Sequence, residues 1–129
     1  MIITEIKQID SLVEQVLVNG ANVISLDMND YRGVKKSSTS LKAITLEISE
    51  WSAIQSLEEV MKEAGCGSVT NVLICVGVSD AKAVSVAQMR MLRDLIHANT
   101  ADANVVWGLK ESESEGSAIK ILVVLGYSD

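Results

Sequence analysis

Two aspartates three residues apart are the side chains in this sequence whose type and spacing could do chemistry. Asp27 and Asp30 lie in the stretch ISLDMNDYRGV (24–34), between an apolar run and the start of a predicted helix. They could form half of an active site. They could also be structural, with Asp27 capping a helix that begins near Met28 and Asp30 favouring its positive first turn. The local sequence favours the cap, because caps are common and catalytic pairs are rare.

The rest of the sequence lacks the partners that most catalytic sites need. No GxxxxGK[ST] or GxGxxG motif follows a predicted strand, so the usual backbone cradle for nucleotide phosphates is missing. His97 is the single histidine, which leaves a His-pair metal site or a Ser-His-Asp triad without partners. Near the end of a predicted helix, His97 is better explained as a favourable end charge. We therefore expect no catalytic residue, cofactor or metal in this chain alone.

The cysteines and an acidic run are weaker candidates for a metal site. Cys66 and Cys75 form no CxxC pair and are too few for a zinc site. Without a secretory segment at the N-terminus, they are expected to be reduced thiols in a cytoplasmic protein. Glu111, Glu113 and Glu115 could bind calcium, but a solvated loop explains them better, because no ordered set of oxygen ligands is implied.

Composition limits the classes of partner. The 129 residues suffice for one domain with one core, and 48% of them are hydrophobic. The formal net charge of −6 argues against nucleic acid, which is bound by clustered cations. The short basic cluster Arg32, Lys35 and Lys36 is better explained as a solvated helix face. No apolar run reaches the roughly 18 residues that span a bilayer.

Hydrophobic spacing and turn residues locate the expected elements. Helices are expected over residues 5–19 before Asn19-Gly20, over residues 51–64 between Ser49 as cap and Gly65 as stop, and from the capping box of Ser85 and Gln88 onward, with Val84 and Met89 as a hydrophobic staple. Strands are expected over residues 41–48, 71–77, 104–109 and 119–126. An acidic connection separates the last two strands, which is typical of a β-hairpin.

This order predicts an α/β, two-layer domain. After an N-terminal helical segment (1–40), residues 41–129 read β-α-β-α-β-β, a four-stranded mixed sheet in a single domain, 1–129. Right-handed crossovers would place both central helices on one face. Leu122 and Val124 then point away from that face, opposite to Ile121 and Val123. This second face must be covered by the N-terminal helix, another subunit or a ligand.

The end of the chain resembles the last hairpin of FtsZ, the bacterial homologue of tubulin. The residues that carry the resemblance are Ala103, Asn104, Val105, Val106, Trp107, Gly108, the acidic loop Glu111–Glu115, and Gly126. The stretch NVLICVGVSDAKAVSVAQMRMLRDLI (71–96) is similar to the preceding strand, loop and helix of that family. The resemblance extends collinearly over nearly the whole chain and implies the fold of the FtsZ C-terminal domain.

The opening stretch is similar to the FtsZ loop that enters the GTP pocket of the next subunit. Its aspartates match Asp27 and Asp30, although Ser25 replaces the family asparagine and Met28 the usual aromatic residue. In the family these carboxylates orient water against the γ-phosphate, a positioning role. The resemblance thus implies a partner-binding segment containing Asp27, Asn29, Asp30 and Arg32, which would act in trans.

Three functions follow from the resemblance and the missing phosphate cradle. The first is a non-enzymatic assembly module of FtsZ type, which self-associates or docks on an FtsZ-type filament. The second is a small-molecule-binding oligomer or small enzyme with its site between subunits. The third is a fragment of a longer GTPase. We expect a homodimer or weak oligomer, paired through the N-terminal helix or the second sheet face.

Overall fold

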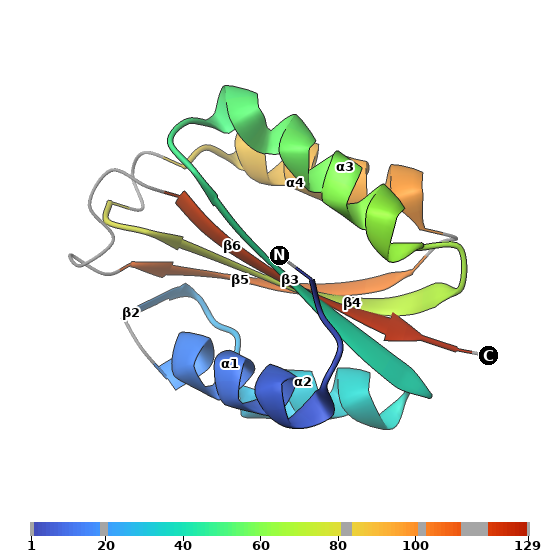
Figure 1. Ribbon diagram of the computed structural model, residues 1–129. Coiled ribbons are helices and arrows are strands. Elements are labelled where there is room, and N and C mark those ends of the chain that lie inside the picture. Colours follow the sequence, from blue (N-terminus) through green and yellow to red (C-terminus); the bar gives the residue numbers. More distant parts are fainter. Residues whose placement is uncertain (1, 19–20, 81–83, 101–102, 112–118, 129) are drawn as a thin grey trace.

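The computed structural model describes residues 2–18, 21–80, 84–100, 103–111 and 119–128. A mixed β-sheet lies between two layers of helices (Figure 1). The elements follow the order β1 (Ile2–Ile3), α1 (Ile6–Val18), β2 (Ala21–Ile24), α2 (Met28–Lys36), β3 (Ser40–Ile48), the 3₁₀ helix η1 (Trp51–Ile54), α3 (Gln55–Ala64), β4 (Val69–Val78), α4 (Val86–Asn99), β5 (Asn104–Glu111) and β6 (Ile119–Tyr127).

Within the described ranges, the sheet has six strands in the order β1-β3-β6-β4-β5-β2; β4 and β5 pair in parallel, and the other neighbours pair antiparallel. The four central strands are those predicted from the sequence. The predicted number was too low, because β1 and β2 add one short strand to each edge. β1 has two residues and β2 has four, and strands this short show no periodic pattern in the sequence.

The predicted hairpin between the last two strands is wrong. β6 pairs with β3 on one side and β4 on the other, so β4 separates it from β5. Every side chain of β6 except Lys120 is buried, and such a strand is most stable in the centre of a sheet. The connection that suggested the hairpin, including Glu113 and Glu115, lies outside the described residues.

Both faces of the sheet are covered by helices of this chain. α3 and α4 share one face, as the right-handed crossovers predicted, and pack on Ile121 and Val123. α1 and α2 cover the opposite face, where Leu122 and Val124 are buried with Ile9 and Val13. The domain therefore has three layers instead of the predicted two, and the second sheet face is not available for pairing two copies.

The helix ends confirm two of three predicted signals. Ser85 and Gln88 form the reciprocal capping box, and Gly65 ends α3 with a positive φ of 76°. Ser49 is not a cap, because the chain first forms η1 and begins it at Glu50 without a side-chain bond. No helix within the described ranges is long and apolar enough to cross a membrane.

Two glycines of the family resemblance let the α1–α2 layer approach the sheet. A Cβ atom on Gly108 would lie 2.4 Å from Cβ of Leu26 and 3.0 Å from the carbonyl oxygen of Ile24. A Cβ atom on Gly126 would lie 2.1 Å from Oγ of Ser38. Gly108 and Gly126 therefore allow the segments just before and after α2 to lie directly on β5 and β6.

Candidate functional site

Leu26, Asp27 and Asp30 belong to a segment, called the Asp27 segment below, that connects the edge strand β2 to α2 and includes the start of that helix. Leu26 is buried over Gly108 and fixes the chain to the sheet immediately before Asp27. Asp27 itself is the N-cap residue of α2, with an extended backbone. The apolar anchor and the cap together determine where the two carboxylates lie.

The two carboxylates form a reciprocal cap, as the structural interpretation predicted. Oδ1 of Asp27 accepts hydrogen bonds from the backbone N–H of Asn29 at 2.9 Å and of Asp30 at 3.3 Å. Oδ2 of Asp30 accepts from the backbone N–H of Asp27 at 2.9 Å. Three amides at the start of α2 are satisfied in this way, and negative charge lies at the positive end of the helix.

The cap uses only one oxygen of each carboxylate. Within the described part of the chain, Oδ2 of Asp27 and Oδ1 of Asp30 take part in no hydrogen bond or ion pair. Asp27 is exposed and Asp30 is half-buried. The structural and functional interpretations are therefore compatible, because each side chain can cap the helix and still accept one bond from outside.

An open hollow of about 300 Å³ lies beside the cap, between the end of α1 and the start of α2. Its lining, which we call the α1–α2 corner, consists of Leu17, Val18, Asp27, Met28, Asn29 and Arg32. Nη1 of Arg32 donates to Oδ1 of Asn29 at 2.9 Å, which holds the guanidinium over the first turn of α2. Leu17, Val18 and Met28 are apolar and the other three residues are polar, so the hollow has a mixed lining, in which Val18 is 66% exposed.

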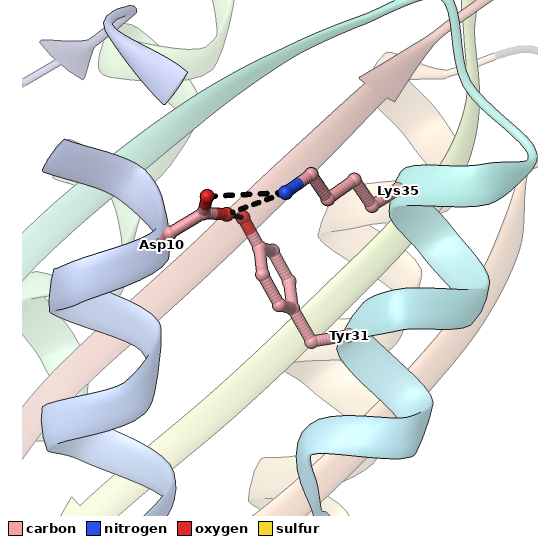
Figure 2. Close-up of polar contacts among 3 residues, drawn as sticks. All are labelled: Asp10, Tyr31 and Lys35. Atoms are coloured by element: carbon pink, nitrogen blue, oxygen red, sulfur yellow. Dashed lines mark hydrogen bonds and ion pairs between the residues drawn. The ribbon is translucent and has the colours of Figure 1, made fainter. Parts of the chain in front are cut away.

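A buried tyrosine ties the two helices of the corner together (Figure 2). The hydroxyl of Tyr31 donates to Oδ1 of Asp10 on α1 at 2.5 Å, and Nζ of Lys35 lies 3.0 Å from both oxygens of the same carboxylate. Tyr31 is only 2% exposed. Asp10, Tyr31 and Lys35 thus set the position of α2, and with it the cap, relative to α1.

The charges of this cluster follow from its contacts. The hydrogen bond from Tyr31 lowers the pKa of the Asp10 carboxyl. Burial raises this pKa, but the hydrogen bond and positive charge of Lys35 lower it further, so the net shift is downward. Burial, followed by the bond to the Asp10 carboxylate, raises the pKa of Tyr31. Asp10 is accordingly an anion and Tyr31 a neutral donor at neutral pH.

The roles of Asp10 and Tyr31 and the apolar lining of the corner were not predicted from the sequence. Lys35 is exposed with Arg32 and Lys36, as expected for a solvated helix face, and it also forms an ion pair with Asp10 across the two helices. Asp10 and Tyr31 are 21 positions apart, so no helical or strand period links them. The one available signal was a tyrosine on the apolar side of a short predicted helix, where its hydroxyl needs a partner.

The remaining candidate residues lie apart from the corner. Cys66 and Cys75 are free thiols that are buried, and burial raises the pKa of both, that of Cys75 to about 11. His97 is exposed in the last turn of α4. In the ranges that the structure describes, no three His, Cys, Asp or Glu side chains gather as a metal site requires.

Sequence comparisons return no relative. No protein-family model matches the chain, and no curated protein matches it.

The fold, in contrast, has clear counterparts among solved structures. FtsZ of M. jannaschii, in an empty dimer, aligns with a TM-score of 0.68 at 16% identity, over 94% of this chain and 36% of that one. TubZ of Bacillus thuringiensis, in GDP-form protofilaments, aligns with a TM-score of 0.63 at 13% identity, over 95% and 36%. CetZ2 of Haloferax volcanii, a GTPγS-bound protofilament, aligns with a TM-score of 0.61 at 11% identity, over 81% and 34%.

The aligned region is the C-terminal part of those proteins and excludes their nucleotide-binding domain. This chain spans about a third of their length. Its six-stranded mixed sheet between two helical layers is the fold of the C-terminal domain of FtsZ, TubZ and CetZ.

Proposed function

We propose that this chain is a non-enzymatic assembly module that docks on an FtsZ-type protein through the α1–α2 corner. The observation that carries the proposal is the fold of an FtsZ C-terminal domain combined with two capping carboxylates that each retain an unbonded oxygen. Contact with another molecule is the remaining route to function, because the sequence carries no phosphate cradle of its own.

The composition of the corner suits a protein partner. Leu17, Val18 and Met28 give the hollow an apolar lining, while Asp27 and Arg32 add opposite charges to it. Protein–protein interfaces usually combine apolar and polar groups. A hollow this open buries too little of a small molecule to hold it tightly, whereas it can receive a side chain from another protein.

The two free carboxylate oxygens suggest what docking does. Presented to a nucleotide bound by a partner, Oδ2 of Asp27 and Oδ1 of Asp30 could accept from and orient a water molecule near a phosphate. The cap restricts both side chains, so little further ordering is needed on binding. The module would then cap an exposed filament end or stimulate its hydrolysis of nucleotide.

The experiment is light scattering and GTP turnover of a polymerising FtsZ with and without this protein. We expect a change in polymer mass, turnover or both. Asp27→Asn keeps the cap, since asparagine caps as well as aspartate, but removes the charge. It should therefore abolish any effect on turnover while the helix stays intact. No change in polymer mass or turnover with the unaltered chain would refute the proposal.

A matched pair of charge reversals tests the surface itself. Arg32→Glu changes the lining of the corner, whereas Lys7→Glu makes the same charge change at the far end of α1, on an exposed residue outside the corner. Docking should be lost in the first variant and retained in the second. Equal loss in both would point to net charge, because long-range attraction depends on total charge more than on position.

The other functions remain predictions with less support. α1 and α2 cover the sheet face on which a ligand site was expected, so that prediction loses its basis. A small-molecule site between subunits would require a second copy at another surface. A longer GTPase would be recognised from the intact mass of the native product.

A further inference from the structure

We propose that two copies of this chain pair face to face through the layer formed by α3 and α4, with α3 of each copy lying over α4 of the other. This surface is on the opposite side of the sheet from the α1–α2 corner (Figure 1). The proposal is therefore independent of the function proposed above.

The outer side of α4 carries two arginines in line with His97, next to one exposed aspartate, Asp94. Arg90, Arg93 and His97 follow the spacing i, i+3, i+7, which places them on one side of the helix, and all three are exposed. Among the described residues none of the three takes part in a hydrogen bond or ion pair. Two arginines one turn apart on the exposed side of a helix offer a positive surface to acidic groups of another molecule.

The neighbouring helix α3 is acidic. Glu59 and Glu63, at i and i+4, are exposed on its outer side, and Glu58 is already paired with Lys62 at 3.0 Å. α3 and α4 lie side by side in one layer (Figure 1). Glutamates outnumber Lys62 on α3, and arginines outnumber Asp94 on α4, so the layer presents a helix of net negative charge next to a helix of net positive charge.

The direction of the strands determines how such a layer can pair with itself. β3 and β4 both run antiparallel to β6, and β5 runs parallel to β4, so both crossover helices run in the same direction. A two-fold axis parallel to the helices and between them lays α3 of one copy over α4 of the other, with opposite charges in contact. An axis across the helices would stack α3 on α3 and α4 on α4, with like charges in contact. Charge complementarity therefore selects the first arrangement, which is isologous and closes as a dimer.

Exposed apolar side chains accompany the charges. Val86 is 71% exposed and lies on the same side of α4 as Arg90, one turn before it, and Met91 on this helix is 42% exposed. Burying these side chains in the dimer adds a hydrophobic contribution to the charge pairs.

The experiment is sedimentation velocity of the full chain at concentrations up to about 1 mM, where even a weak dimer is populated. We expect a dimer that weakens when salt is raised from about 0.1 M to about 1 M, because the screening length falls from about 10 Å to about 3 Å. Arg90→Glu with Arg93→Glu, and separately Glu59→Arg with Glu63→Arg, should each weaken the dimer at least about tenfold.

Mixing the two double variants should restore the dimer, because each then offers the charge that the other lacks. Circular dichroism of each variant establishes that it is folded before mixing. A chain that stays monomeric at every concentration overturns the proposal. So does a dimer that neither double variant weakens, or a mixture that does not re-form it. Binding of an acidic peptide to α4 of a monomeric chain would assign Arg90 and Arg93 to a different partner.

The pairing would have one consequence for the proposed function, on which this step rests. A dimer joined through α3 and α4 carries its two α1–α2 corners on opposite outer sides, so it could bridge two filaments. The charge variants should then retain docking and lose bundling in pelleting assays at low force. Loss of docking with an intact dimer would instead refute the corner and leave the dimer standing.

Discussion

The hydroxyl of Tyr31 on α2 and the carboxylate of Asp10 on α1 are joined by a hydrogen bond of 2.5 Å, which links the two helices that form the α1–α2 corner (Figure 2). The tyrosine ring is buried, whereas the carboxylate is partly open to solvent and also contacts Lys35. The bond thus connects the apolar interior of the helical layer to its charged surface.

Tyr31→Phe removes this bond and keeps the ring in the core. Because the partner is a partly solvated carboxylate, we expect a loss of about 1 kcal/mol in the free energy of unfolding. Urea denaturation followed by circular dichroism measures the loss. Phe should leave the m-value unchanged, since the buried area hardly changes. A variant as stable as the original chain would show that the bond adds nothing net.

The loss of stability at acid pH should depend on Asp10. The pKa of this carboxyl is lowered in the folded chain, chiefly by Tyr31, so the folded state favours the ionised form. Its stabilisation is present above the unfolded value of about 3.8 and is lost as the pH falls through the lower folded value. In Asp10→Asn, this part of the decline in stability below about pH 4 should disappear. Thermal denaturation of both proteins between about pH 2 and about pH 6 makes the comparison.

At alkaline pH, stability should fall as the pH rises, and the tyrosines are the groups involved. Burial raises the pKa of Tyr127 to about 12, and burial with Asp10 raises that of Tyr31 further. An acid whose pKa is raised on folding stabilises the fold below its unfolded value of about 10 and loses that contribution at higher pH. We expect both tyrosines to stay protonated in the folded chain at about pH 10.5, and the ultraviolet absorbance of tyrosinate to rise only on unfolding. Early absorbance change in the native protein would contradict this.

Features of this fold that depend on local spacing could be predicted from the sequence, whereas features that depend on packing between distant segments could not. The alternation of Ile121 and Leu122 and the capping box of Ser85 and Gln88 were predictable, because local spacing alone determines them. The place of β6 between β3 and β4 was not, because strand order depends on the burial of whole strands. The same holds for the corner: the cap at Asp27 is local, whereas the link between Asp10 and Tyr31 exists only after α1 and α2 pack on the sheet.

Two substitutions of Asp27 separate the contribution of its hydrogen bonds to the helix start from the contribution of its charge. Asp27→Ala removes an acceptor from two backbone amides, and we expect a loss of about 1 kcal/mol in the free energy of unfolding. Asp27→Asn should lose no more than about half of that, because asparagine caps well but lacks the charge that interacts with the helix dipole. Chemical denaturation of both variants gives the difference. Equal losses would mean that the negative charge, rather than the hydrogen bonds, stabilises the start of α2.

Replacing glycine by alanine should have opposite effects on stability at Gly108 and at Gly33. A methyl group on Gly108 would overlap Leu26, whose Cβ lies 2.4 Å from the position that the new carbon atom would take. Gly108→Ala must therefore push the Asp27 segment away from β5, and overpacking of this kind costs about 1–3 kcal/mol. Gly33, on α2, has no atom within 4 Å of the same position.

Gly33→Ala should stabilise the chain by about 0.5–1 kcal/mol, because alanine restricts the unfolded backbone and favours the helix. Denaturation of the two variants side by side tests both signs with the same chemical change. Docking gives a second readout: Gly108→Ala should weaken binding to an FtsZ-type partner more than its loss of stability explains, since the carboxylates move with Leu26. Gly33→Ala should bind as the original chain does, because the corner does not include residue 33. If both variants bind equally well, the position of the Asp27 segment does not matter for docking.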